Sequence, residues 1–151
     1  MKKLLTVLLQ LTLLLITAQQ TDISGTYSYG NGYGYEYLTL TDENQVRISR
    51  FTDNGGKSRK SAIATYTLAG DSLKLTYLSP RLERKLSQRF GYLFIIKEHD
   101  RFRALLPPAE VANWETHLER YEKMNEDIGR EIPDRFLSQL FDEAKIYIKP
   151  K

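Results

Sequence analysis

Short runs in which apolar and polar residues alternate, each ended by a turn, fill the first two thirds of the chain. In residues 35–41 the tyrosines and threonines fall on one face, while Glu36, Leu38 and Leu40 fall on the other, which is the period of a strand. Asp53-Asn54-Gly55-Gly56 is a typical hairpin turn. The alternation predicts strands at residues 26–29, 35–41, 45–52, 60–69, 73–77, 89–97 and 102–106.

The pattern changes after Pro107-Pro108, since proline has no N–H to give to a sheet. Apolar residues then recur every three or four positions, with Trp114, Leu118 and Tyr121 at the centre, and predict an amphipathic helix at about 109–128. A shorter helix is predicted at 133–144 and a last strand at 146–148. Residues 79–87 combine Pro80 with several charges and predict a polar loop.

About seven short strands followed by helices are typical of a barrel or a sandwich. Ser24-Gly25-Thr26-Tyr27 occupies the place of the Gly-x-Trp motif that begins the first strand of bacterial lipocalin-like barrels, and the late helix and strand follow the order of that family. The chain therefore resembles this family.

The resemblance implies a mainly β fold with C-terminal helices: an antiparallel meander barrel of about seven to eight strands followed by one long and one short helix. It also implies ligand binding in the barrel mouth more than catalysis. The family carries a late basic residue that covers the motif aromatic, for which Arg101 and Arg103 are both candidates.

Residues 1–18 have the layout of a secretory signal peptide, with Lys2 and Lys3 before a short apolar run and a small residue, Ala18, at the expected cleavage point. A spanning helix needs ~20 apolar residues, which this run does not reach. We expect residues 19–151 to form one exported domain, periplasmic or extracellular.

Charge and cysteine content narrow the function. Without Lys2 and Lys3, the 22 basic residues become 20 against 19 acidic ones, a net charge of +1, so we expect no nucleic-acid partner. The absence of cysteine excludes disulfides, thiol catalysis and thiolate metal sites.

Large aromatic residues in the strand runs are the candidate walls of a binding site, because their rings hold an apolar tail while their hydroxyls orient a polar head. Tyr33 belongs at the rim, where neighbouring glycines allow loop movement, and Arg47 and Arg89 offer charge for an anionic head. The candidate ligand-binding residues are Tyr33, Tyr35, Tyr37, Tyr66, Tyr77, Tyr92, Phe94, Arg47 and Arg89.

Catalytic motifs are weak in comparison. The two histidines, His99 and His117, lack convergent ligands nearby in the sequence, and we interpret both as surface residues, with no metal and no cofactor. No Gly-x-Ser-x-Gly elbow occurs.

We therefore expect an exported, non-enzymatic binding protein for a lipid or another amphipathic small molecule in a barrel cavity. The alternative is a structural or adaptor protein of the cell envelope that binds another macromolecule, or the membrane surface, through its tyrosine-rich face or a basic rim.

Overall fold

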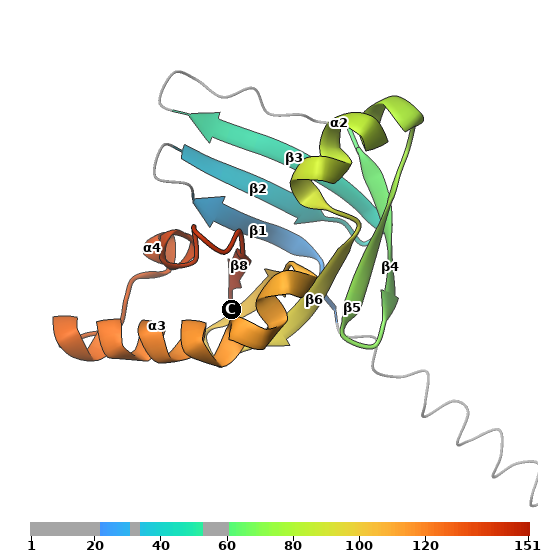
Figure 1. The fold of residues 1–151 in the computed structure, drawn as a ribbon. Coiled ribbons are helices and arrows are strands. Elements are labelled where there is room, and N and C mark those ends of the chain that lie inside the picture. The colour runs from blue at the N-terminus through green and yellow to red at the C-terminus, as the bar shows by residue number, and fades with distance from the viewer. Residues whose placement is uncertain (1–21, 31–33, 53–60) are drawn as a thin grey trace, which may run out of the picture.

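The computed structural model describes residues 22–30, 34–52 and 61–151, which form a closed antiparallel barrel in the strand order β1-β2-β3-β4-β5-β6-β7-β8 (Figure 1). The strands are β1 (Gly25–Gly30), β2 (Gly34–Leu40), β3 (Gln45–Thr52), β4 (Ala64–Ala69), β5 (Ser72–Tyr77), β6 (Leu93–Glu98), β7 (Phe102–Leu106) and β8 (Tyr147–Pro150). The helices are α2 (Pro80–Phe90), the 3-10 helix η1 (Pro108–Asn113), α3 (Trp114–Ile128) and α4 (Asp134–Leu140). The prediction of a mainly β barrel with C-terminal helices is confirmed.

The eighth strand is the one predicted after the helices. β8 pairs with β7, with Leu105 opposite Tyr147, and with β1, where Ser28 lies opposite Ile148. A chain that meanders through seven strands thus returns at its C-terminus to close the barrel, which leaves no free edge between first and last strands.

The predicted polar loop at 79–87 is wrong, because this segment is helix α2. Ser79 caps the helix by accepting a hydrogen bond from the backbone N–H of Leu82 at 3.3 Å, and Pro80 stands at the first helical position, where a missing N–H has no cost. Leu82, Leu86 and Phe90, spaced by four residues, face the barrel core. The strand predicted from residue 89 accordingly begins only at Leu93.

The long C-terminal helix begins later than predicted, because residues 108–113 form the 3-10 turn η1 before α3. Trp114 and Tyr121 are buried as expected, and Leu118 is half-buried. The apolar stripe does not continue as predicted, since Met124 and Ile128 are exposed. The shorter helix spans seven residues of the predicted 133–144.

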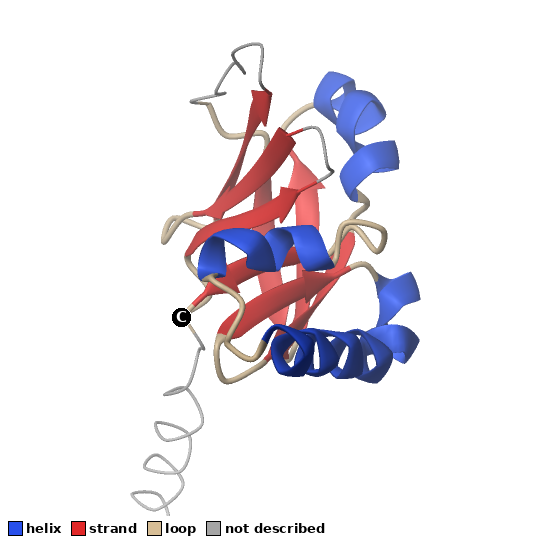
Figure 2. Cartoon of the chain, turned by 90° about the vertical axis from the view of Figure 1, so that its left-hand side faces the viewer, coloured by secondary structure: helices blue, strands red, loops and turns tan. Residues whose placement is uncertain are grey.

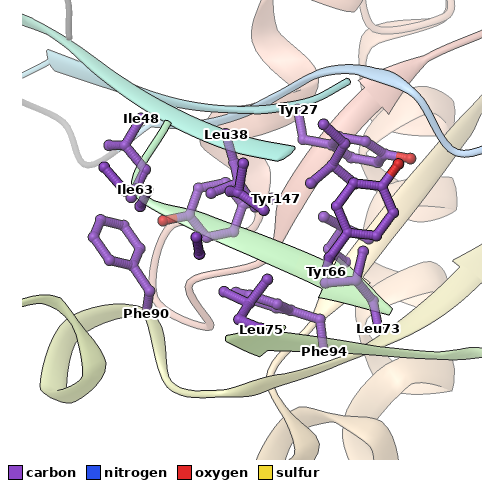
Figure 3. Packing of buried hydrophobic residues seen from close by; sticks show 14 of the residues in the cluster. Tyr27, Leu38, Ile48, Ile63, Tyr66, Leu73, Leu75, Phe90, Phe94 and Tyr147 are labelled. Atoms are coloured by element: carbon purple, nitrogen blue, oxygen red, sulfur yellow. The ribbon is translucent and has the colours of Figure 1, made fainter. Parts of the chain in front are cut away.

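Two hydrophobic clusters stand on opposite sides of the barrel wall. The interior cluster contains Tyr27, Leu38, Phe94 and Tyr147 together with Phe90 of α2 (Figure 3). The outer cluster joins β7 and β8 to α3 and α4 through Phe102, Ala104, Leu106, Trp114, Tyr121, Ile132, Leu137, Phe141, Ala144, Ile146 and Ile148. Figure 2 shows α2 apart from the C-terminal helices. α2 therefore lies at the barrel mouth, on a different part of the barrel from α3 and α4.

Candidate functional site

A pocket of about 350 Å³ lies at the mouth of the barrel, next to the point where β1 ends and β2 begins. Its walls come from four parts of the chain: β1 and β2, the C-terminal end of α2 with the start of β6, the Pro107-Pro108 step, and the turn before β8. The lining residues are Tyr29, Glu36, Arg89, Phe90, Gly91, Leu93, Phe94, Pro107, Pro108, Lys145 and Tyr147.

Glu36 is the polar centre of this pocket. It shares the inner face of β2 with Leu38 and Leu40, and is only 4% exposed. The Tyr147 hydroxyl donates a hydrogen bond to its Oε1, while the guanidinium groups of Arg89 and Arg50 both donate to its Oε2, Arg50 through Nε at 3.1 Å. A buried carboxylate needs such donors, because it has lost its water.

The Tyr147 hydroxyl is held in its protonated, donating form. Burial raises the pKa of Tyr147 well above its usual value, and the negative charge of Glu36 raises it further. Across the physiological pH range Tyr147 is therefore a fixed hydrogen-bond donor to Glu36.

Aromatic rings complete the wall. Phe94 meets the Tyr147 ring edge to face at 5.9 Å between centroids, and Tyr29 meets it at 5.6 Å. Burial also raises the pKa of Tyr29 above its usual value. The arrangement places flat apolar surface beside one compact charged cluster, which is typical of small-molecule sites.

A second pocket, of about 170 Å³, lies on the other side of Arg89 and Phe90. It is lined by Ile48 and Ile63 from the barrel interior and by Lys85 and Leu86 of α2, with Arg50 between them. Figure 3 shows the Phe90 ring directed toward Ile63 and Ile48. The end of α2 thus separates two neighbouring hollows and contributes Arg89 to both.

The opposite end of the barrel carries another pocket, of about 430 Å³, lined mostly by polar residues: Asp22, Ile23, Ser24, Asp42, Asn44, Tyr66 and Leu68. The motif residue Tyr27 is fully buried and donates its hydroxyl to the Ile23 carbonyl at 3.0 Å. The Lys149 Nζ lies 5.8 Å from the centre of its ring. In Figure 3 the hydroxyls of Tyr27 and Tyr66 point away from the end that Tyr147 faces. Both ends are therefore hollowed, and the pocket lined mostly by aromatic and other apolar residues is the one at Glu36.

Of the two candidate basic residues, Arg103 is the one that lies beside Tyr27. Arg103 approaches the Tyr27 hydroxyl closely enough to offset part of the pKa rise that burial causes, and also pairs with Glu98. Arg101 is on the outer face, where it donates to the Tyr121 hydroxyl and to the Ile132 carbonyl, each at 3.1 Å.

The predicted site residues that the structure describes lie in three kinds of position: in the lining of the mouth pocket, elsewhere in the interior, and on the outside of the barrel. Phe94 and Arg89 line the mouth pocket. Tyr66 and Tyr77 face the interior but do not line the mouth pocket, and their hydroxyls bond to the Thr41 carbonyl at 2.9 Å and to the Gly91 carbonyl at 2.7 Å. Tyr66 lines the pocket at the opposite end instead.

The expected interior position of Tyr35, Tyr37 and Tyr92 is wrong, whereas Arg47 lies on the outer face as the alternation of residues 45–52 predicts. Tyr35 and Tyr37 are on the outer face of β2, because Leu38 and Leu40 take the inner face of the same strand. Arg47 is exposed on β3, since Val46 and Ile48 on either side of it face inward. Tyr92 is 45% exposed and donates to Glu83. Tyr33 lies outside the described residues.

The candidate residues chosen from the sequence do not include Tyr29, Glu36, Arg50, Phe90, Lys145 and Tyr147. One signal was present for Glu36, which is a carboxylate on the face that otherwise carries leucines. Phe90 and Arg89 belong to α2, whose helical period was obscured by its charges. Nothing local connects Tyr147 with the pocket.

Both histidines are less exposed than predicted. His99 stacks on Phe102 at 4.5 Å, and the His117 side chain pairs with Glu110 at 3.1 Å. Within residues 22–30, 34–52 and 61–151, no group of three or more His, Cys, Asp or Glu residues is arranged to hold a metal ion. In the same part of the chain, no helix has the length and apolar character needed to cross a bilayer.

Comparison of the chain with protein-family models, with curated proteins and with solved structures finds no match.

Proposed function

We propose that this protein is an exported, non-catalytic binding protein for a lipid or another amphipathic small molecule, with the ligand seated at the barrel mouth. The observation that carries the proposal is the pocket of about 350 Å³ in which an aromatic wall adjoins the Glu36 cluster. Concave, mostly apolar sites with a few fixed polar groups are the usual form of ligand sites.

The size of the pocket limits the ligand. Its volume is near the lower end of the ~300–1,000 Å³ range of small-molecule sites. Leu38 and Phe94, both nearly fully buried, occupy the interior beneath it. The proposed ligand is thus a short amphiphile, or one that leaves part of its length outside the mouth.

Binding without a chemical step also fits the pocket's carboxylate. Glu36 accepts hydrogen bonds from Tyr147, Arg50 and Arg89, which engage three of the roughly four lone-pair sites of its carboxylate and offset its charge. A general base needs a free lone pair directed at the proton it removes.

The test is titration of a fluorescent fatty acid into the protein. Tyr29→Ala removes a ring from the pocket wall, and we expect about tenfold weaker binding, the effect of losing one large apolar contact. Tyr37→Ala is the matched control, because Tyr37 is half-buried on the outer face of β2. Circular dichroism checks that both variants fold. Saturable binding that Tyr29→Ala weakens and Tyr37→Ala leaves unchanged supports the proposal.

The adaptor hypothesis is the second candidate, and one observation favours it. Tyr35 and Tyr37 stack on the outer face of β2 with ring centres 6.2 Å apart, which places a tyrosine pair where another macromolecule can reach it. Absence of saturable amphiphile binding by the wild-type protein would overturn the binding-protein proposal and favour this one.

A further inference from the structure

The charges at the barrel mouth do not balance. The guanidinium groups of Arg50 and Arg89 both bond to the same oxygen of Glu36, so two positive charges meet one negative charge. Lys145 adds a third positive charge to the wall of the pocket at Glu36. A further carboxylate, Asp142, acts on Tyr29 but lies outside the pocket lining.

Both arginines keep donors for a ligand. A guanidinium carries five N–H groups, and the bond to Glu36 uses one of them on each residue. The side chains of Arg89 and Arg50 are 35% and 52% exposed, whereas that of Glu36 is 5% exposed. The carboxylate is therefore inside and the cations are outside it, facing the pockets.

Glu36 also fixes where those cations stand. Its two oxygens are bonded to Tyr147 on one side and to both arginines on the other, and the Arg89 guanidinium lies 5.2 Å from the centre of the Phe90 ring. Guanidinium groups held in place in this way lose less side-chain entropy when a ligand binds.

We infer that the ligand carries an anionic head, a carboxylate or a phosphate, that is bound by Arg89 and Arg50, with its apolar part on the wall of Tyr29, Phe90 and Phe94. This inference rests on the proposed function and narrows its ligand class. Carboxylate and phosphate each present a pair of oxygens that a planar guanidinium group can bind through two parallel hydrogen bonds.

Isothermal titration with three probes of equal chain length separates the alternatives: decanoate, decyl phosphate and 1-decanol, each below its aggregation limit. The wild-type protein is expected to bind one or both anions at least about tenfold more tightly than 1-decanol, the effect of a charge-assisted hydrogen bond. The anion bound more tightly identifies the head.

Arg89→Gln is expected to remove this preference while leaving 1-decanol binding within about twofold. Arg84→Gln on the same helix is the matched control, since Arg84 is exposed and lines neither pocket. Arg50→Gln is the second variant, on a more exposed side chain, in case Arg89→Gln lowers the melting temperature.

Equal affinity of the wild-type protein for the three probes would overturn the anionic-head inference and leave the proposed function standing. An unchanged anion preference in both arginine variants would also overturn it. Binding of none of the probes would count against the proposed function itself.

Discussion

Tyr147 donates its hydroxyl hydrogen bond to Glu36 across 111 residues of chain, from the first residue of β8 to the third residue of β2. β1 stands between these two strands in the barrel, so the bond spans the inner face of β1 at the mouth. It connects the strand that closes the barrel to the carboxylate at the centre of the candidate site. The strand that closes the fold therefore also supplies a hydrogen-bond donor to the candidate site.

Tyr147→Phe should lower the free energy of unfolding by about 1.5–3 kcal/mol, the contribution of a hydrogen bond to a charged group, because buried Glu36 loses one of its three donors. Urea unfolding measures the change. Tyr37→Phe on the outer face is the control and should change the free energy by less than about 0.5 kcal/mol. Equal effects of the two substitutions would contradict a stabilising Glu36–Tyr147 bond.

Trp114→Ala should lower the free energy of unfolding by roughly 3–5 kcal/mol, as for other large buried aromatics. Trp114 is 5% exposed and packs edge to face on Phe102 at 6.3 Å, so its removal leaves a hole between α3 and β7. Thermal or urea unfolding checks this, with Glu115→Ala at the exposed neighbouring position as control. A loss below about 1 kcal/mol would show that Trp114 does not anchor the helix.

Stability should fall in alkaline solution as the pH rises from about 10 toward about 12. Burial raises the pKa of Tyr27 to about 12, against an ordinary value of 10.0, so between these pH values the unfolded chain releases a proton that the folded protein keeps. The contribution is complete below pH 10 and is lost as the pH approaches 12, with a slope of up to about 1.4 kcal/mol per pH unit.

Urea midpoints measured across this alkaline range test the slope. Tyr27→Phe should reduce it without abolishing it, because burial also raises the pKa of Tyr77 to about 12 and that of Tyr147 well above its usual value. Ser61→Ala, which removes no titrating group, should leave it unchanged. A slope that is the same in wild type and Tyr27→Phe would assign the alkaline loss to other groups.

Ser79→Ala should cost about 1 kcal/mol, the usual effect of losing an N-cap side chain. The Ser79 hydroxyl accepts the backbone N–H of Leu82, one of the donors that the first turn of α2 leaves unpaired. Ser61→Ala, at an exposed position outside the helices, is the control. An unchanged urea midpoint for Ser79→Ala would show that the cap does not stabilise α2.

Export with cleavage is a further prediction, made from the basic start and the short apolar run of residues 1–18. Protein secreted by the producing cell should begin at or near Gln19 when its N-terminus is sequenced. Membrane-bound protein that keeps Met1 would contradict the prediction.

Local periodicity determined the classes of most elements. Residues close together in the sequence carry both periods: two residues at 35–41, and three to four residues at Trp114, Leu118 and Tyr121. The strands and the long helix could therefore be predicted from the sequence. α2 was not predicted, because its exposed face carries many charges and few of its positions are apolar. Leu82, Leu86 and Phe90 are recognised as one helical face only from the core residues that they contact.

The sequence by itself determined a mainly β fold, a barrel or a sandwich, with late helices, and also the two alternating faces of each strand. The closed barrel is seen in the tertiary structure. Only the tertiary structure decided which face of β2 points inward, because that choice depends on the aliphatic side chains with which Leu38 and Leu40 pack. It also decided the candidate site, since Glu36, Arg50, Arg89 and Tyr147 come from β2, β3, α2 and β8. Closure of the barrel brings these distant charges together, and no local pattern records that proximity.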